Sequence, residues 1–225
     1  MPSPKFPIVV LISGSGSNLQ ALIDAVACGG LIVEIRAVIS NRPDAKGLQR
    51  ARDAGIPTEV MDHTAFESRE AFDQALQKCI DGFKPKLVVL AGFMRLLTDD
   101  FVNHYLGRML NIHPSLLPAY TGLNTHRRAL EAGEKQHGAS VHFVTAELDG
   151  GPLILQVTVD VQPDETPESL AARVLEQEHK IYPLAVQWFA EGRLQLLNQH
   201  ACLDGETLAQ PLQFEALPAG TGGTV

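Results

Sequence analysis

The sequence predicts an α/β fold: a single doubly wound, mostly parallel sheet with helices on both faces and an antiparallel C-terminal part. Continuous apolar runs at residues 6–13 and 85–92 are typical of parallel strands that are covered on both faces. Amphipathic helical patterns separate the apolar runs, as in alternating βαβ units. The short connection between the strand patterns at 138–145 and 153–159 indicates an antiparallel pair near the C-terminus.

In the first half of the chain, each predicted strand leads into a predicted helix. Strands are expected at 6–13, 33–39, 57–61 and 85–92, and helices after Asn18 and at 45–54 and 67–80. Gly55 ends the second of these helices, and Phe72 and Ile80 share one face of the third. A short capped helix at 98–105 then precedes a strand that ends at Pro114, because proline has no N–H group to give to a sheet.

The second half begins with a predicted helix at 126–132. The strand expected at 138–145 alternates small or polar residues with apolar ones, as a half-buried strand does. Thr166-Pro167-Glu168 has the cap, proline and acid of a helix N-terminus, so a long helix is expected from there to about Phe189. A bend is expected near Pro183, which cannot donate a helical hydrogen bond.

The composition indicates one soluble domain. The 225 residues are 45% hydrophobic, so we expect a single domain over 1–202 and a loosely ordered, Gly- and Pro-containing tail over 203–225. The net charge of −8 argues against nucleic-acid and membrane partners. Cys28, Cys79 and Cys202 are widely spaced, which favours reduced thiols. Because no apolar run has transmembrane length and no signal-peptide pattern is visible, we expect a cytoplasmic protein.

Asn111 and His113 are the first candidates for chemistry. Side chains on an extended strand alternate between faces, so this amide and this imidazole are expected to project from the same face. Pro114 ends the strand at once, and Pro118 and Gly122 bound the loop that follows. A histidine near a strand end is more often structural than catalytic, so this pattern alone leaves both interpretations open.

A glycine turn at residues 14–18 joins the first strand to the first helix. This arrangement directs backbone N–H groups and a positive helix end at an anion, most often a phosphate. Dinucleotide binding is disfavoured, because the third glycine of that motif is Leu19 here and the next strand ends in Ser40-Asn41-Arg42 without an acid. A phosphate monoester held by residues 16–18 fits better, and a tight turn that only caps the helix is the alternative.

Two more segments complete the candidate site. Residues 93–97 are too apolar for an ordinary exposed loop and are either core or the wall of a pocket for a flat aromatic ring. Asp149 lies in a glycine turn and is either an ordinary turn residue or a carboxylate that folds back onto His113. In the second case it would stabilise the protonated imidazole, and an imidazolium beside an amide suits a developing oxyanion.

The chemistry implied by these groups is direct acyl transfer, in which an amine attacks an activated carbonyl. No serine or cysteine is paired with His113 by a recognisable nucleophile motif, which disfavours a covalent enzyme intermediate. No histidine spacing suggests a zinc site, so no metal is expected.

The motifs resemble those of the phosphoribosylglycinamide formyltransferases, a folate-dependent family, over roughly residues 6–200. The similarity lies in residues 9–20, 90–95, 111–118 and 142–152. The Asn-x-His-Pro-Ser-Leu-Leu-Pro segment with a downstream Asp-Gly-Gly is typical of formyltransferases in general. The Gly-x-Gly-Ser-Asn turn is typical of those with a phosphoribosyl substrate. The resemblance implies a Rossmann-like fold and makes the predicted domain a catalytic one.

The resemblance also implies a role for each candidate residue. Glycinamide ribonucleotide would be bound by Gly16, Ser17, Asn18 and Glu178. The cosubstrate 10-formyltetrahydrofolate would be bound by Arg69, Met94, Arg95, Leu96, Leu97 and Asn111. His113 would be the acid, Asn111 would polarise the formyl carbonyl, and Asp149 would support the protonated imidazole. Formyl transfer through a tetrahedral intermediate would give formylglycinamide ribonucleotide and tetrahydrofolate, a step of de novo purine biosynthesis.

Three other functions fit the same residues less well. A formyltetrahydrofolate hydrolase would carry an N-terminal regulatory domain, whereas five residues precede the first predicted strand. A methionyl-tRNA formyltransferase would need a tRNA-binding domain and a basic face. A noncatalytic phosphosugar-binding module would leave Asn111, His113 and Asp149 without a purpose. We therefore expect small-molecule substrates, no nucleic-acid or membrane partner, and a monomer or homodimer.

Overall fold

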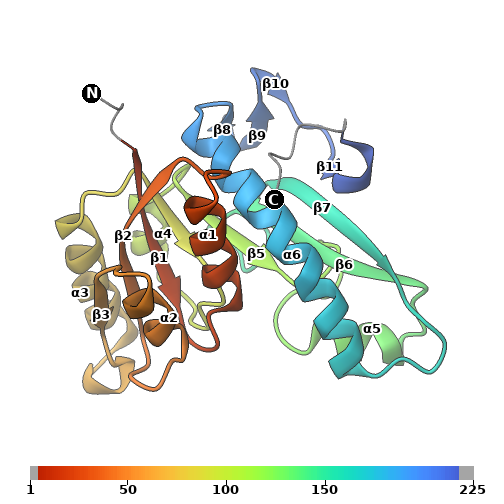
Figure 1. Ribbon diagram of the computed structural model, residues 1–225, viewed down its shortest axis with the longest axis horizontal. Coiled ribbons are helices and arrows are strands. Elements are labelled where there is room, and N and C mark those ends of the chain that lie inside the picture. Colours follow the sequence, from red (N-terminus) through yellow and green to blue (C-terminus); the bar gives the residue numbers. More distant parts are fainter. Residues whose placement is uncertain (1–4, 218–225) are drawn as a thin grey trace. The chain divides into compact units, whose positions relative to one another are not determined.

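The computed structural model describes residues 5–217, whose helices and strands are labelled in Figure 1. The chain forms two compact units, Met1–Asn111 and Ile112–Val225. Within residues 5–217, every helix is too short or too polar to cross a lipid bilayer.

The first unit is built on parallel strands. These are β1 (Phe6–Ile12), β2 (Val33–Ser40), β3 (Thr58–Val60), β4 (Leu87–Leu90) and the first residues of β5 (Met109–His113). Their order is β5-β4-β1-β2-β3, and each neighbouring pair is parallel. Residues 8–12 of β1 are fully buried, which explains why the central strand reads as an unbroken apolar run.

Helices cover both faces of this parallel sheet. They are α1 (Ser17–Ala27), α2 (Gly47–Asp53), α3 (Arg69–Gly82) and α4 (Asp99–His104), with a short 3-10 helix η1 (His63–Ala65) before α3. Strands β2 and β3 lie on one side of β1 in the sheet, and strands β4 and β5 lie on the other side. Because crossovers are right-handed, α1 and α2 lie on one face and α3 and α4 on the opposite face (Figure 1).

The second unit contains antiparallel strands and a long helix. Strand β6 (Gln136–Phe143) pairs with β7 (Leu153–Asp160) in antiparallel fashion, as predicted from their short connection. Helix α6 (Pro167–Ala190) packs on both strands, and α5 (Thr125–Glu131) packs against α6 (Figure 1). A separate antiparallel sheet is formed by β8 (Leu194–Leu197), β9 (His200–Leu203) and β10 (Glu206–Thr207).

The predicted fold class is confirmed: parallel strands with helices on both faces, followed by antiparallel strands. Helix α6 runs through Pro183 as a single helix of 24 residues.

A loose tail was expected from residue 203, but the described structure contains strands and a 3-10 helix up to residue 217. There, β11 (Leu212–Gln213) adds a parallel strand to the edge of β7, and η2 (Phe214–Ala216) follows it. Pairing with the edge strand supplies the order that composition alone did not predict; residues 218–225 of the predicted tail lie outside the described structure.

Candidate active site

The turn after β1 requires glycine at position 16. Gly16 has a φ of 69° and is the N-cap of α1. A Cβ atom there would lie 2.5 Å from the Cα of Gly47, and the N–H of Gly47 donates to the carbonyl of Gly14 at 3.0 Å. Arg50 of α2 also donates to the carbonyl of Ser15 at 2.9 Å. Helix α2 therefore holds the turn in shape through backbone contacts.

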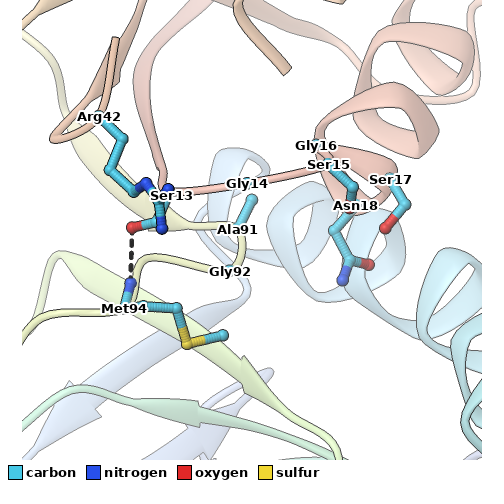
Figure 2. A pocket seen from close by; sticks show the side chains of 10 residues that line it. All are labelled: Ser13, Gly14, Ser15, Gly16, Ser17, Asn18, Arg42, Ala91, Gly92 and Met94. Atoms are coloured by element: carbon cyan, nitrogen blue, oxygen red, sulfur yellow. Dashed lines mark hydrogen bonds between the residues drawn. The ribbon is translucent and has the colours of Figure 1, made fainter. Parts of the chain in front are cut away.

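An open cavity of about 320 Å³ lies beside this turn in the first unit (Figure 2). Its lining consists of Ser13, Gly14, Ser15, Gly16, Ser17, Asn18, Arg42, Ala91, Gly92 and Met94. Gly16 caps α1 without a side-chain hydrogen bond, so the helix N-terminus turns backbone N–H groups and a partial positive charge toward this side. Ser17 and Asn18 add polar side chains, and this combination suits a phosphate group.

The loop after β4 presents apolar side chains to solvent. Met94 is 68% exposed and Leu96 is 57% exposed, so core packing does not explain either residue. Leu97 is half-buried. The guanidinium of Arg95 instead stacks on the ring of Phe72, 4.4 Å from its centroid. This stacking fixes the middle of the loop while its two ends remain available to a ligand.

Arg69 opens α3 and is about half exposed. Its Nε lies 3.9 Å from a carboxylate oxygen of Glu70, a contact at the long end of ion-pair distances. An exposed pair of this kind contributes little to stability, so the guanidinium is available to an anionic ligand at small cost. Apart from the family resemblance, no pattern in the sequence singles out Arg69 among the charged surface residues as a ligand-binding group.

His113 ends β5 in the second unit and lies between two hydrogen-bond acceptors. Its Nδ1 is 3.5 Å from Oδ2 of Asp149, and its Nε2 is 2.9 Å from the carbonyl oxygen of Tyr120. A carbonyl oxygen only accepts, so Nε2 carries a proton, and Nδ1 faces a negative charge. The ring is 6% exposed. These two contacts fix the orientation of the ring.

Asp149 is held in place by its own backbone and by the loop after β5. Its φ of 52° is in the left-handed region, where aspartate is tolerated better than most residues. Oδ2 accepts the N–H of Gly122 at 2.8 Å. Gly151 has no room for a side chain, because a Cβ atom would collide with the carbonyl of Phe143. The Asp-Gly-Gly turn thus folds back onto His113, as the second interpretation of Asp149 predicted.

Three other histidines of the second unit favour the neutral form. Burial lowers the pKa of His137 to about 4, with a smaller contribution from His126. Burial also lowers the pKa of His142 to about 4 and, together with the nearby His113, lowers the pKa of His126.

The remaining candidates lie on ordered elements. Asn111 is half-buried on β5, two residues before His113, as the strand pattern predicted. Glu178 is 6% exposed on α6. Across residues 5–217, no three His, Cys, Asp or Glu side chains group as a metal site would require.

Sequence reasoning missed three parts of these surroundings. Tyr120 and Gly122 contribute backbone atoms, which leave no side-chain signal in a sequence. Arg42 lines the cavity, although its segment served only to exclude a dinucleotide. Ser13 was included in the first strand, and its hydroxyl contacts the N–H of Met94. A polar residue at the end of an otherwise apolar strand was the available signal for Ser13.

Known proteins are similar to this chain in sequence and in fold. Residues 6–186 match the formyl transferase family. The chain is 58% identical over 201 residues to phosphoribosylglycinamide formyltransferase of Escherichia coli K12, covering 89% of this chain and 95% of that protein. The chain belongs to the formyl transferase family. The corresponding Haemophilus influenzae protein is 48% identical over the same shares of both chains.

A solved structure gives the same result for the fold of this formyl transferase. The phosphoribosylglycinamide formyltransferase of Coxiella burnetii superposes with a TM-score of 0.90 at 59% identity. The superposition covers 93% of this chain and 99% of that one. The resemblance stated from the motifs is therefore confirmed at the level of family and fold.

Proposed function

We propose that this formyl transferase moves the formyl group of 10-formyltetrahydrofolate to the amine of glycinamide ribonucleotide. The single observation that carries the chemistry is the His113 ring, held between the carboxylate of Asp149 and a backbone carbonyl. The relatives named phosphoribosylglycinamide formyltransferase support the choice of substrates. The product pair is formylglycinamide ribonucleotide and tetrahydrofolate, within de novo purine biosynthesis.

The proposed reaction is a direct acyl transfer. The amine of the ribonucleotide attacks the formyl carbon, and the carbonyl oxygen of the resulting tetrahedral intermediate becomes negative. The ring of His113, once its Nε2 N–H leaves the carbonyl of Tyr120, and the amide N–H of Asn111 stabilise this oxyanion, as paired donors do in other acyl transfers. The C–N bond to N10 of the folate then breaks, and the proton lost by the amine reaches N10 by way of water.

Asp149 supports the reaction without touching the formyl group. Its carboxylate faces the far nitrogen of the ring and stabilises the protonated form through the chemical step. The hydrogen bond from Gly122 keeps that oxygen in place while charge develops on the substrate. A fixed charge that does not need to reorganise is the source of such stabilisation.

The ribonucleotide phosphate is assigned to the cavity beside the glycine turn. Gly16, Ser17 and Asn18 line it and offer N–H, hydroxyl and amide groups at the N-terminus of α1. We assign Glu178 of α6 to the same substrate, as the resemblance to the phosphoribosylglycinamide formyltransferases implies.

The folate is assigned to the exposed apolar loop after β4 and to two polar side chains. The loop contributes Met94, Arg95, Leu96 and Leu97, whose backbone groups suit the hydrogen-bonding edge of a pterin. Arg95 would act through its backbone, because its guanidinium is stacked on Phe72. Arg69 suits the acidic tail of the cosubstrate, and we assign Asn111 to its formyl end.

Mixing the purified protein with both substrates and following folate deformylation by absorbance tests this function. We expect deformylation only when the ribonucleotide is present, with formylglycinamide ribonucleotide formed in equal amount. Deformylation that proceeds without the ribonucleotide would indicate a hydrolase instead. Binding of the ribonucleotide with no deformylation would indicate a noncatalytic module.

Cellular placement and assembly belong to the same proposal. We infer a cytoplasmic enzyme, because both proposed substrates are small metabolites. A monomer or homodimer is proposed, and light scattering across a range of protein concentrations distinguishes the two.

A further inference from the structure

A buried chain of hydrogen bonds joins the ends of three strands in the first unit. Ser13 follows β1 and is 6% exposed, and Asn41 follows β2 and is 3% exposed. The Ser13 hydroxyl donates to Oδ1 of Asn41 at 2.5 Å. It also accepts the N–H of Met94 at 2.7 Å (Figure 2). Met94 belongs to the loop after β4, so one hydroxyl ties together segments that are far apart in the sequence.

The direction of each hydrogen bond is fixed by chemistry. A backbone N–H only donates and an amide oxygen only accepts, so the hydroxyl of Ser13 gives its one proton to Asn41. It has no proton left for a ligand in the cavity that it lines. An anionic ligand such as a phosphate also brings no proton for the hydroxyl to accept. The hydroxyl is therefore suited to holding protein groups rather than substrate.

Neighbouring contacts make this junction rigid. The N–H of Ser13 donates to the carbonyl of Gly92 at 3.1 Å, so Ser13 contacts the loop after β4 at two points. Asn41 is also held through its backbone, because Nδ1 of His63 lies 2.9 Å from the backbone carbonyl oxygen of Asn41. Buried polar groups that are all paired hold a single arrangement, and removing one leaves its partners unpaired.

We propose that Ser13 and Asn41 are positioning residues for formyl transfer, which hold the Met94 loop at a fixed place beside the glycine turn. The cavity is lined by both the turn at 13–18 and residues 91, 92 and 94, so this junction sets the distance between its two sides. The inference rests on the proposed function, which assigns the turn to the ribonucleotide and the loop to the folate. It adds that the Ser13–Asn41 junction holds the Met94 loop, assigned to the folate, at a fixed distance from the glycine turn, assigned to the ribonucleotide.

The test compares Ser13→Ala with Ser13→Thr, which keeps the hydroxyl. Ser13→Ala removes the acceptor of the Met94 N–H, so we expect hydrogen exchange of that amide to become at least tenfold faster. The KM for 10-formyltetrahydrofolate should rise about tenfold, while the KM for the ribonucleotide should change by less than threefold. Ser13→Thr should restore both quantities to within threefold of the unmodified protein.

Two further variants keep the test decisive. Asn41→Ala keeps the Ser13 oxygen that accepts the Met94 N–H, but it leaves the Ser13 hydroxyl free to rotate. We therefore expect it to increase the exchange rate of the Met94 amide and the KM for 10-formyltetrahydrofolate, each by a smaller factor than Ser13→Ala does. It replaces Ser13→Ala if that protein fails to fold. Thr166→Ala is the matched control, because it removes the capping hydroxyl of α6 and lines no part of the cavity. Thr166→Ala should lower thermal stability and leave both KM values unchanged.

Calorimetric titration with tetrahydrofolate separates failure of this inference from failure of the proposed function. Weaker tetrahydrofolate binding by Ser13→Ala, restored by Ser13→Thr, supports the inference. Unchanged exchange of the Met94 amide, or an unchanged folate affinity in Ser13→Ala, overturns it while leaving the proposed function intact. An unmodified protein that does not bind tetrahydrofolate refutes the proposed function, and this inference with it.

Discussion

Nδ1 of His113 lies 3.5 Å from Oδ2 of Asp149. That separation is longer than a good hydrogen bond and within the range of an ion pair, so the carboxylate acts on the ring mainly through its charge. The side chains are 8% and 9% exposed, and the charge is therefore screened less than a surface charge would be.

Asp149→Asn removes the charge and keeps the shape. The amide oxygen of asparagine still accepts the N–H of Gly122, so the turn should fold as before. We expect kcat to fall by roughly two to three orders of magnitude, the scale of losing one electrostatic contribution in an active site. Steady-state kinetics and a thermal melt of the same preparation measure both effects. A loss below about threefold with an unchanged melt would remove Asp149 from the mechanism.

The buried histidines predict how stability depends on pH. In the folded protein the pKa of His137 is about 4, as is that of His142, whereas an unfolded histidine protonates near 6.5. Between these values the unfolded chain binds more protons, so stability is lost as the pH falls from about 6.5 to about 4. Each histidine contributes on the order of 3 kcal/mol to this loss.

His137→Gln tests that dependence, because glutamine does not titrate. Urea unfolding at pH 7 and pH 5 should show a smaller loss of stability for this variant than for the unmodified protein. His200→Gln is the matched control, since His200 is exposed and its replacement should leave the pH dependence unchanged. Equal losses for His137→Gln and the unmodified protein would contradict neutral burial of His137.

Gly16→Ala should damage the glycine turn through its backbone. The φ of 69° disfavours alanine, and the new Cβ would lie 2.5 Å from the Cα of Gly47. We expect a loss of about 1–3 kcal/mol of folding free energy and at least a tenfold higher KM for the ribonucleotide. Gly14→Ala provides the comparison, because a Cβ atom there meets nothing within 4 Å. Similar unfolding free energies for the two variants would argue against this account of the turn.

Asn18→Ala should separate the two substrates. Asn18 is 8% exposed and lines the cavity assigned to the phosphate, whereas the folate is assigned to the loop after β4. We expect the KM for the ribonucleotide to rise about tenfold or more, with the KM for the folate within threefold of its original value. The opposite pattern would mean that the two half-sites have been assigned the wrong way round.

Much of the fold was predictable because parallel strands covered on both faces leave an unmistakable apolar run. Strand β1 is the clearest case, and the alternation in β6 and the caps of α6 were similarly local signals. All four short strands after α6, β8 to β11, were missed, because strands of two to four residues are stabilised by their partners rather than by their own composition.

The candidate site was predictable to the extent that its groups are side chains in short motifs. Asn111 and His113 were placed by strand alternation, and Asp149 by its glycine turn. The carbonyl of Tyr120 beside His113 was not predictable, since it is a backbone atom placed by a loop. The junction at Ser13 was also hidden, because its three partners meet only when separate strands end at the same edge.

The kcat of His113→Ala measures the central claim most directly. If the imidazolium is the acid of formyl transfer, its loss should lower kcat by two to four orders of magnitude, with both KM values changed little. Folding should be checked on the same sample by its thermal melt. A folded His113→Ala protein that keeps more than about a third of the original kcat would contradict the account.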